Sequence, residues 1–411
     1  MSEHIGVSSH GPRLRIALFA DSFHEINGVG TLAREYATYA ERQGWPFLCV
    51  YGGTETRFTQ SGSLEQLQLR RGPLSLAVDA NIECDPFLAR HRQLVTDRLL
   101  PFRPDLVHIT GPSDVSTLGF WAANLAGVPV VASWHTNLHE YASGRLASAC
   151  SIVPQPLLQA VCRRVNTASL WALAKWYRLA HFVMAPNQEM VELLRQRTGR
   201  PSFLMGHGVD TTLFSPDRRT RADSRFCIGY VGRLTPEKNV RALAELEQQL
   251  LAAGLRDFRT VLVGDGSERE WLGANMQTAE FRGVLHGVDL ARAFADMDVF
   301  VFPSLTDTFG LVLLEAMSSG VPVVVRPEAG HNAGIVDGET GFHSRDFCAT
   351  VSRLMMDSSA GRRVSVAARA HALSRGWDAV FADLHRIYAA GLASEEVIRR
   401  MPTRRFGPAE P

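Results

Sequence analysis

One loop combines two basic side chains with the expected start of a helix. The segment GRLTPEKN, residues 232–239, follows an apolar stretch at 225–231 and precedes helical sequence at 239–253. Arg233 offers a fork of N–H donors and Lys238 a compact charge, and a helix N-terminus adds positive potential. Only two of the 43 basic residues are lysines, Lys175 and Lys238. The loop therefore predicts a diphosphate site, although two solvated charges on a surface turn remain the alternative.

Two carboxylates follow another buried strand, expected at 298–302. In SLTDTFGLVLLE, residues 304–315, Asp307 lies in the loop and Glu315 lies eight positions later in an apolar helix. A charge among such neighbours is costly unless it has a partner. Ribose hydroxyls are suitable partners for Glu315 and sugar hydroxyls for Asp307. The alternatives are an internal salt bridge, or a helix N-cap at Asp307 or Thr308.

A glycine-containing loop follows the first expected strand at 14–20. Its residues Asn27-Gly28-Val29-Gly30 precede a helix, so backbone N–H groups there could approach a phosphate. A tight turn that needs glycine is the alternative. The sequence lacks a complete GxGxxG, which counts against a dinucleotide-dependent dehydrogenase.

A histidine stands at the carboxyl end of a further expected strand. His135 occurs in SWHTN, after the apolar run 128–134. It could donate a hydrogen bond to a substrate hydroxyl or phosphate. A lone histidine with a purely structural role is the alternative, and His207 is similarly placed in the connection at 206–216.

The elements that would position these residues alternate between short apolar strands and helices, twice along the chain. Such alternation predicts parallel sheets covered on both faces. We expect an α/β protein with two doubly wound, Rossmann-like domains that face each other across a ligand-binding cleft. The predicted parts are a first domain at 1–205, a second domain at 206–375, and a C-terminal segment at 376–411 with a helix at about 378–398. Residues 55–100 give no clear pattern.

Composition limits the function classes. The 411 residues are 45% hydrophobic with a net charge of +1, which is typical of a globular protein and gives no sign of nucleic-acid binding. Six cysteines without a CxxC pair favour a reduced, cytoplasmic chain and no metal site. There is no signal-peptide pattern and no apolar stretch long enough to span a membrane.

A basic, aromatic helix is expected at 154–179. It carries Arg163, Arg164 and Lys175 beside Trp171 and Trp176. Such a helix can lie at the inner face of a membrane as a peripheral contact. Packing of its apolar residues against the sheet is the alternative.

Several of these motifs together resemble one enzyme family. GRLTPEKN, VGDGSE and FPSLTDTFGLVLLEAMSSGVPVV are similar to the C-terminal half of retaining glycosyltransferases of family four, which have the GT-B fold. INGVG, SWHTN and GVDTTLFSP match the same family, so the resemblance covers about residues 13–375. Within the family, the chain is similar to the bacterial branch of mannosyltransferases and glycolipid glycosyltransferases.

The resemblance implies that the domain at 1–205 is the acceptor side, that the domain at 206–375 binds the nucleotide sugar, and that the helix within 376–411 crosses back to the first domain. It also implies a role for each motif. Arg233 and Lys238 would bind the donor diphosphate and Glu315 the ribose, while Asp307 and His135 would contact the donor sugar. The loop at Gly28 and Val29 would approach the phosphates. The rest of the donor site would be formed by Thr308, Phe309, Gly310 and Leu311.

The implied reaction transfers a hexose, mannose or glucose, from a nucleotide diphosphate sugar to a hydroxyl of a lipid or glycan, with retention. The sequence shows no acidic metal pair, so we expect no metal and no cofactor. Two departures stand out: relatives usually have Glu where this chain has Asp307, and His207 precedes Gly208 where relatives often have Asn or Arg. The alternatives are a non-catalytic sugar-nucleotide-binding protein, or a phosphorylase or epimerase of the same fold.

Overall fold

A computed structural model describes residues 13–25, 27–79, 82–135, 155–305, 307, 309–328 and 334–400. The chain divides into two compact units. Unit 1 comprises Met1–Gly206 and Val380–Pro411, and unit 2 comprises His207–Ala379. The sequence had suggested boundaries at 205/206 and 375/376, so the second one lies a helical turn later in the structure.

Unit 1 is built on an eight-stranded sheet with the order β10-β9-β8-β7-β1-β2-β4-β3. Every pairing in it is parallel except β3 with β4. The strands are β1 (Ile16–Ala20), β2 (Phe47–Gly53), β3 (Arg57–Ser61), β4 (Leu64–Arg70), β7 (Leu106–Ile109), β8 (Val130–Ser133), β9 (Phe182–Ala185) and β10 (Ser202–Leu204), and β5 (Leu76–Asp79) pairs with β6 (Ile82–Cys84) in a separate hairpin.

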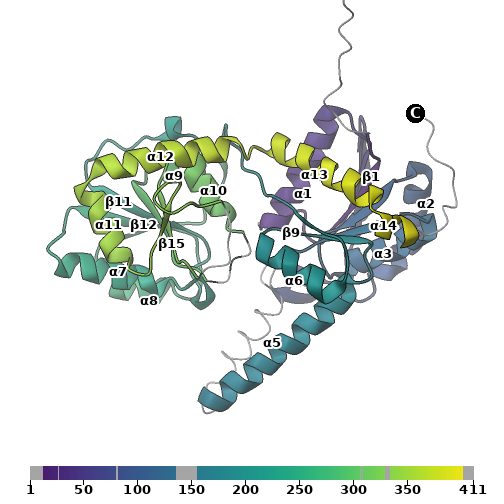
Figure 1. Ribbon diagram of the computed structural model, residues 1–411, viewed down its shortest axis with the longest axis horizontal. Helices are drawn as coiled ribbons and strands as arrows, with labels where there is room; N and C mark the ends of the chain where they lie inside the picture. The colour runs from purple at the N-terminus through teal and green to yellow at the C-terminus, as the bar shows by residue number, and fades with distance from the viewer. Residues whose placement is uncertain are drawn as a thin grey trace, which may run out of the picture. The chain divides into compact units, whose positions relative to one another are not determined.

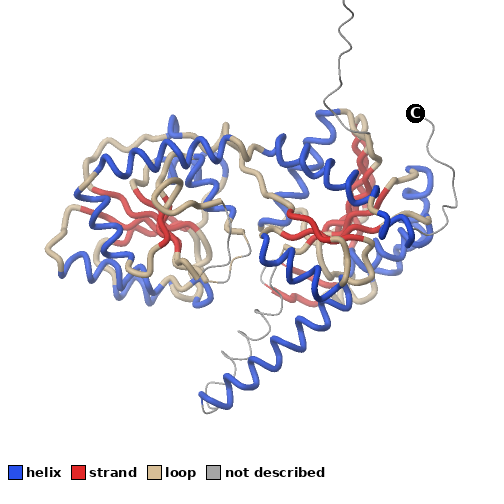
Figure 2. The backbone as a smooth tube through the Cα atoms, viewed as in Figure 1, coloured by secondary structure: helices blue, strands red, loops and turns tan. Residues whose placement is uncertain are grey.

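The helices of unit 1 cover both faces of this sheet (Figures 1 and 2). They are α1 (Gly28–Gln43), α2 (Arg92–Phe102), α3 (Asp114–Ala126), α5 (Gln155–Tyr177), α6 (Gln188–Thr198), α14 (Glu395–Arg400) and the unit's part of α13 (Trp377–Ala393), with a 3-10 turn at Leu88–His91. The inner strands β1, β7, β8 and β9 are buried because both faces carry helices, which explains their continuous apolar sequence.

Unit 2 holds a six-stranded, all-parallel sheet with the order β13-β12-β11-β14-β15-β16. Its strands are β11 (Phe226–Val231), β12 (Phe258–Val263), β13 (Ala279–Gly283), β14 (Val299–Phe302), β15 (Val323–Val325) and β16 (Phe342–His343). Its helices are α7 (Arg241–Ala252), α8 (Arg269–Asn275), α9 (Gly287–Ala295), α10 (Leu311–Ser318), α11 (Phe347–Met356) and α12 (Ser358–Leu373), with 3-10 turns at Pro216–Arg218 and Pro236–Lys238.

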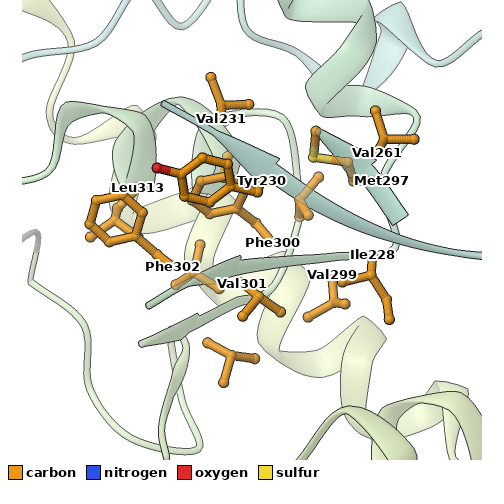
Figure 3. Packing of buried hydrophobic residues seen from close by; sticks show 14 of the residues in the cluster. Ile228, Tyr230, Val231, Val261, Met297, Val299, Phe300, Val301, Phe302 and Leu313 are labelled. Atoms are coloured by element: carbon orange, nitrogen blue, oxygen red, sulfur yellow. The ribbon is translucent and has the colours of Figure 1, made fainter. Parts of the chain in front are cut away.

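The two central strands of unit 2 pack through aromatic side chains. Tyr230 on β11 and Phe302 on β14 stack with ring centroids 6.5 Å apart, and both are buried (Figure 3). Gly229 leaves room for this core, because a Cβ there would lie 2.0 Å from the Met297 sulfur. The core therefore fixes the spacing of β11 and β14, whose following loops carry the predicted site.

The structure confirms the predicted α/β class with two parallel, doubly wound sheets, and it changes two local expectations. The expected final helix at about 378–398 is two helices, α13 and α14, separated at Ser394. Glu395 and Glu396 stand in the first turn of α14, where acidic side chains favour a new helix start. Residues 57–70, which gave no clear pattern, form the β3–β4 hairpin at the sheet edge.

The helix α5 combines packed and exposed side chains. Leu170, Leu173 and Trp176 pack against the unit 1 core. Arg163 and Arg164 are exposed, as is Trp171 with 61% of its surface accessible. The N-terminal part of the helix extends away from the sheet of unit 1 (Figure 1). No described helix is both long and apolar enough to cross a bilayer.

Candidate functional site

The loops after β11 and β14 meet where the strand order of unit 2 reverses. The chain passes from β11 outward to β12 and β13, and then returns to place β14 on the other side of β11. Sheets of this kind bind ligands at such a switch point, beyond the carboxyl ends of the strands. Both predicted donor-binding motifs of unit 2 therefore lie at the position that the topology favours.

The β11 loop is held by close backbone packing. Leu234 donates its N–H to the Asp265 carbonyl at 2.9 Å. A Cβ on Gly264 would lie 1.9 Å from the Gly232 carbonyl oxygen, and one on Gly266 would lie 2.3 Å from that of Leu234. The glycines of the GDG segment thus allow this loop to pack directly against the loop that carries Arg233 and Lys238.

The structure brings two of the predicted site residues together. Lys238 Nζ donates to Asp307 Oδ1 at 2.7 Å, and their side chains are 12% and 21% exposed. Arg233 forms a longer ion pair with Glu237 at 3.3 Å. The salt bridge considered for Asp307 is therefore present, and its partner is the lysine of the other motif.

Glu315 lies on α10 among apolar residues. Burial raises the pKa of its carboxyl to about 7. Among the described residues, no side chain forms an ion pair or hydrogen bond with this carboxylate, so the alternative of an internal salt bridge does not hold for Glu315 within that part of the chain. A partly buried acid of this kind is typical of a functional position.

The start of α10 is shaped by Gly310, whose φ of 74° lies in the left-handed region. Leu311 is the first helical residue, and among the residues that the structure describes no side chain caps this N-terminus. Phe309 is buried and stacks on His207, with ring centroids 4.6 Å apart. Burial lowers the pKa of His207 to about 4, which keeps the ring neutral. Thr308, predicted in the same site, lies outside the described residues.

In unit 1 the predicted phosphate loop is the start of α1. Asn27 caps this helix by accepting a hydrogen bond from the Gly30 N–H at 2.8 Å, and Gly28 and Val29 are its first two residues. A Cβ on Gly30 would lie 2.6 Å from the Glu25 carbonyl oxygen. Gly30 is therefore needed by the turn itself, while Gly28 and Val29 form the helix N-terminus.

His135 follows β8 and is 9% exposed. Its Nε2 lies 2.7 Å from the Ser133 hydroxyl, which is itself 2.8 Å from Nε2 of His108 on β7. Sequence reasoning gave no role to Ser133, although it opens the SWHTN motif, and it did not include His108, which belongs to no motif. Gly28, Val29 and His135 belong to unit 1, and the other described candidates to unit 2.

In the described ranges, no group of three or more His, Cys, Asp or Glu side chains is arranged to hold a metal ion. The groups that could bind an anion here are Arg233, Lys238 and backbone N–H groups at helix starts. The arrangement in unit 2 is chemically suited to a ligand that carries both phosphates and hydroxyls.

Comparison with known proteins gives matches in both units. The family model described as Glycosyltransferase Family 4 matches residues 26–213, and the model described as Glycosyl transferases group 1 matches residues 225–357. A GDP-mannose-dependent alpha-mannosyltransferase of Mycolicibacterium smegmatis is 31% identical over 400 residues, covering 92% of this chain and 98% of the relative. Its namesake in Mycobacterium tuberculosis is 29% identical, with coverages of 92% and 97%.

Solved structures show the same fold. A sucrose-phosphate synthase from Thermosynechococcus elongatus superposes with a TM-score of 0.67 at 20% identity, covering 93% of this chain and 100% of that one.

Proposed function

The chain belongs to glycosyltransferase family 4, and from this premise we propose that it transfers mannose from GDP-mannose to a hydroxyl acceptor with retention of configuration. The observation that carries the choice of donor is the likeness, over nearly the whole length of both chains, to mannosyltransferases that depend on GDP-mannose. In unit 2, the basic side chains of Arg233 and Lys238 and the carboxylate of Glu315 support a nucleotide diphosphate sugar as the donor.

In this proposal the β11 loop binds the donor diphosphate. Lys238 and Arg233 carry the two positive charges; Lys238 forms an ion pair with Asp307 and Arg233 with Glu237. Positive charge at the diphosphate stabilises the negative charge that develops as the bond to the sugar breaks. The same groups perform the task that a metal ion performs in other enzymes, so we propose that the transfer needs no metal.

The carboxylates and the histidine are assigned to hydroxyl groups. Glu315 accepts hydrogen bonds from the ribose, because its carboxylate has no cation among the described residues. Asp307 and His135 contact the donor sugar. Phe309, Gly310 and Leu311 form the adjoining backbone and wall of the donor site, and Thr308 is assigned to the same loop.

The reaction follows from these contacts. The bond between the anomeric carbon and the diphosphate oxygen breaks, and the acceptor hydroxyl forms a new bond on the same face of the sugar. The departing phosphate takes the acceptor proton. The N-terminus of α1 at Gly28 and Val29 contributes its dipole to the phosphates. No pair of carboxylates flanking the sugar is required.

We propose a lipid as the acceptor and a peripheral membrane contact through α5. Arg163, Arg164 and Trp171 are exposed on this helix, and Lys175 lies 5.3 Å from the Trp171 ring. Exposed basic and aromatic side chains on one helix are the pattern that binds an anionic lipid surface.

The test is donor turnover by the purified protein. GDP-mannose, GDP-glucose, UDP-glucose and UDP-N-acetylglucosamine are compared in calorimetry and in a donor-hydrolysis assay with a lipid extract as acceptor source. We expect the tightest binding and the fastest turnover with GDP-mannose. Equal or better turnover with a uridine donor would overturn the choice of donor, and binding without any turnover would favour a non-catalytic binding protein.

A further inference from the structure

The β11 loop, residues 232–239, is held at one end from inside the core of unit 2. Tyr230 lies on β11 and is fully buried among apolar side chains (Figure 3). Its hydroxyl donates a hydrogen bond to the Arg233 carbonyl at 2.9 Å. A Cβ on Gly232 would lie 2.8 Å from that hydroxyl oxygen, so the glycine leaves the room that the hydroxyl occupies. The core therefore fixes the backbone of the loop at the residue that carries the first cation.

The other end of the β11 loop is tied to the loop after β14. Asn239 has left-handed backbone angles, φ 54° and ψ 35°, and ends the 3-10 turn that carries Lys238. Its side-chain Nδ2 donates to the Pro303 carbonyl at 3.3 Å. Pro303 directly follows β14 and stands four positions before Asp307. Lys238 and Asn239 thus both reach the same loop, one through an ion pair and the other through a neutral amide.

The two links respond differently to a bound anion. A diphosphate competes with the Asp307 carboxylate for Lys238, because both are negatively charged acceptors. The amide of Asn239 has no charge and its acceptor is a backbone carbonyl, so an anion at Lys238 leaves this hydrogen bond in place. The amide can therefore hold the two loops together when the ion pair between them opens.

Packing alone does not explain a tyrosine at position 230. The neighbouring Phe300 and Phe302 show that a phenyl ring fills this part of the core, and Tyr230 stacks on Phe302. Burying a phenol hydroxyl costs free energy unless it is hydrogen-bonded. Burial raises the pKa of Tyr230 well above its usual range, so the hydroxyl keeps its proton and donates it to the Arg233 carbonyl. The hydroxyl thus adds a contact with the loop that phenylalanine could not make.

The asparagine at position 239 likewise does more than the turn requires. Glycine enters the left-handed region without a steric cost, whereas other residues, asparagine among them, enter it less readily. Glycine would therefore make the same turn, but it could not donate to the Pro303 carbonyl. The hydrogen bond to Pro303 is the contact that asparagine adds.

We propose that Tyr230 and Asn239 are positioning residues that fix the two ends of the β11 loop, and that they thereby hold the charges of Arg233 and Lys238 where one diphosphate can contact both. The inference rests on the proposed function, in which these two cations bind the donor diphosphate. It gives two neutral side chains a role in donor binding that requires no contact with the donor. A loop that is already ordered raises affinity, because the ligand does not have to order it on binding.

The test is a pair of double-mutant cycles measured by calorimetry with GDP. Tyr230→Phe removes one hydroxyl and keeps the ring, and Asn239→Gly keeps the left-handed backbone and removes the amide. Each should weaken GDP binding about 2- to 10-fold, the range that one neutral hydrogen bond contributes. Tyr230→Phe should cause no further loss in an Arg233→Met background, and Asn239→Gly none in a Lys238→Met background, because the charge that each residue positions is then absent.

Turnover and a control variant complete the test. In the two single variants, KM for GDP-mannose should rise by a similar factor with a smaller change in kcat, because the cost of ordering the loop is met when the donor binds. The matched control is Thr260→Val, which removes another hydroxyl that is buried in unit 2. Thr260 lies on β12, where it pairs with Ile228 of β11, and its hydroxyl is 3.3 Å from that of Thr278. This variant should keep the GDP affinity of wild type.

The outcomes separate the inference from the proposed function. Unchanged GDP affinity in either Tyr230→Phe or Asn239→Gly, while Arg233→Met and Lys238→Met weaken binding, would overturn the inference alone. So would a loss that persists in full in the Arg233→Met and Lys238→Met backgrounds, because a purely structural role acts equally in both backgrounds. Unchanged affinity in the Arg233→Met and Lys238→Met variants themselves would refute the diphosphate site of the proposed function, and the inference with it.

Discussion

Replacement of Glu315 by glutamine should stabilise the unliganded protein above neutral pH and still impair its function. The carboxyl has a pKa of 4.5 in the unfolded chain, and burial raises it to about 7 in the folded state. A shift of this size corresponds to about 3 kcal/mol of unfolding free energy. Glutamine resembles the protonated acid and never carries the charge, so the variant avoids this cost.

The sign of the pH dependence follows from linkage. Because the folded pKa is raised, the stability of the wild type is complete below pH 4.5 and is lost as the pH rises to about 7. Glu315→Gln should therefore unfold at the same temperature as wild type near pH 4. Above pH 7 it should unfold about 6–12 °C higher in the transition of unit 2. The same variant should bind GDP about 10-fold more weakly and lose most turnover, because the ribose loses a charged acceptor.

The assay is calorimetric unfolding of both proteins from pH 4 to 8.5, with GDP titrations at pH 7.5. Glu247→Gln is the matched control, because Glu247 is buried in the same unit and accepts hydrogen bonds from the Thr278 N–H at 3.1 Å and from its hydroxyl. That variant should unfold at a lower temperature and keep its GDP affinity. A Glu315→Gln protein that unfolds below wild type at pH 8 would refute the reasoning.

Three further predictions concern binding, metal and membrane. Lys238→Met should weaken GDP binding about 10- to 100-fold in calorimetry, because a charge-assisted contact contributes about 1.5–3 kcal/mol, whereas Arg241→Met on the neighbouring helix should leave the affinity unchanged. Turnover should persist in EDTA; a complete loss that manganese restores would contradict metal-independent transfer. Wild type should sediment with anionic vesicles at low salt and Arg163→Glu/Arg164→Glu should not, with Arg195→Glu/Arg197→Glu on α6, both exposed, as the charge-matched control; wild type that stays in the supernatant would rule out docking.

The fold could be predicted from the sequence because its strands are continuous apolar runs. Strands buried on both faces leave that pattern, and helices between them imply parallel pairing. The β3–β4 hairpin could not be predicted in the same way. Its strand Arg57–Ser61 lies at the sheet edge and is mostly exposed, so it lacks the apolar run that marks the inner strands.

The sequence predicted the motifs of the site one by one. It did not predict which of their side chains are in contact. Lys238 and Asp307 are 69 positions apart, and they meet because β14 returns to the side of β11. The Tyr388 hydroxyl of α13 contacts the His108 ring from 280 positions away, and neither residue carries a local signal. A motif records the residues of one loop, whereas such contacts depend on strand order and on where the last helix packs.

The salt bridge between Lys238 and Asp307 does not weaken the case for a donor site. The pair is one charge-assisted hydrogen bond, whereas a diphosphate carries more negative charge than one carboxylate and offers several acceptor oxygens, each worth about 1.5–3 kcal/mol in such a bond. In the proposed site, we therefore expect an incoming diphosphate to replace Asp307 at Lys238, and likewise Glu237 at Arg233. Asp307, once released from Lys238, is then available to accept hydrogen bonds from the hydroxyl groups of the sugar. The pairs hold both cations in place while the site is empty, and the same exchange couples diphosphate binding to the release of Asp307.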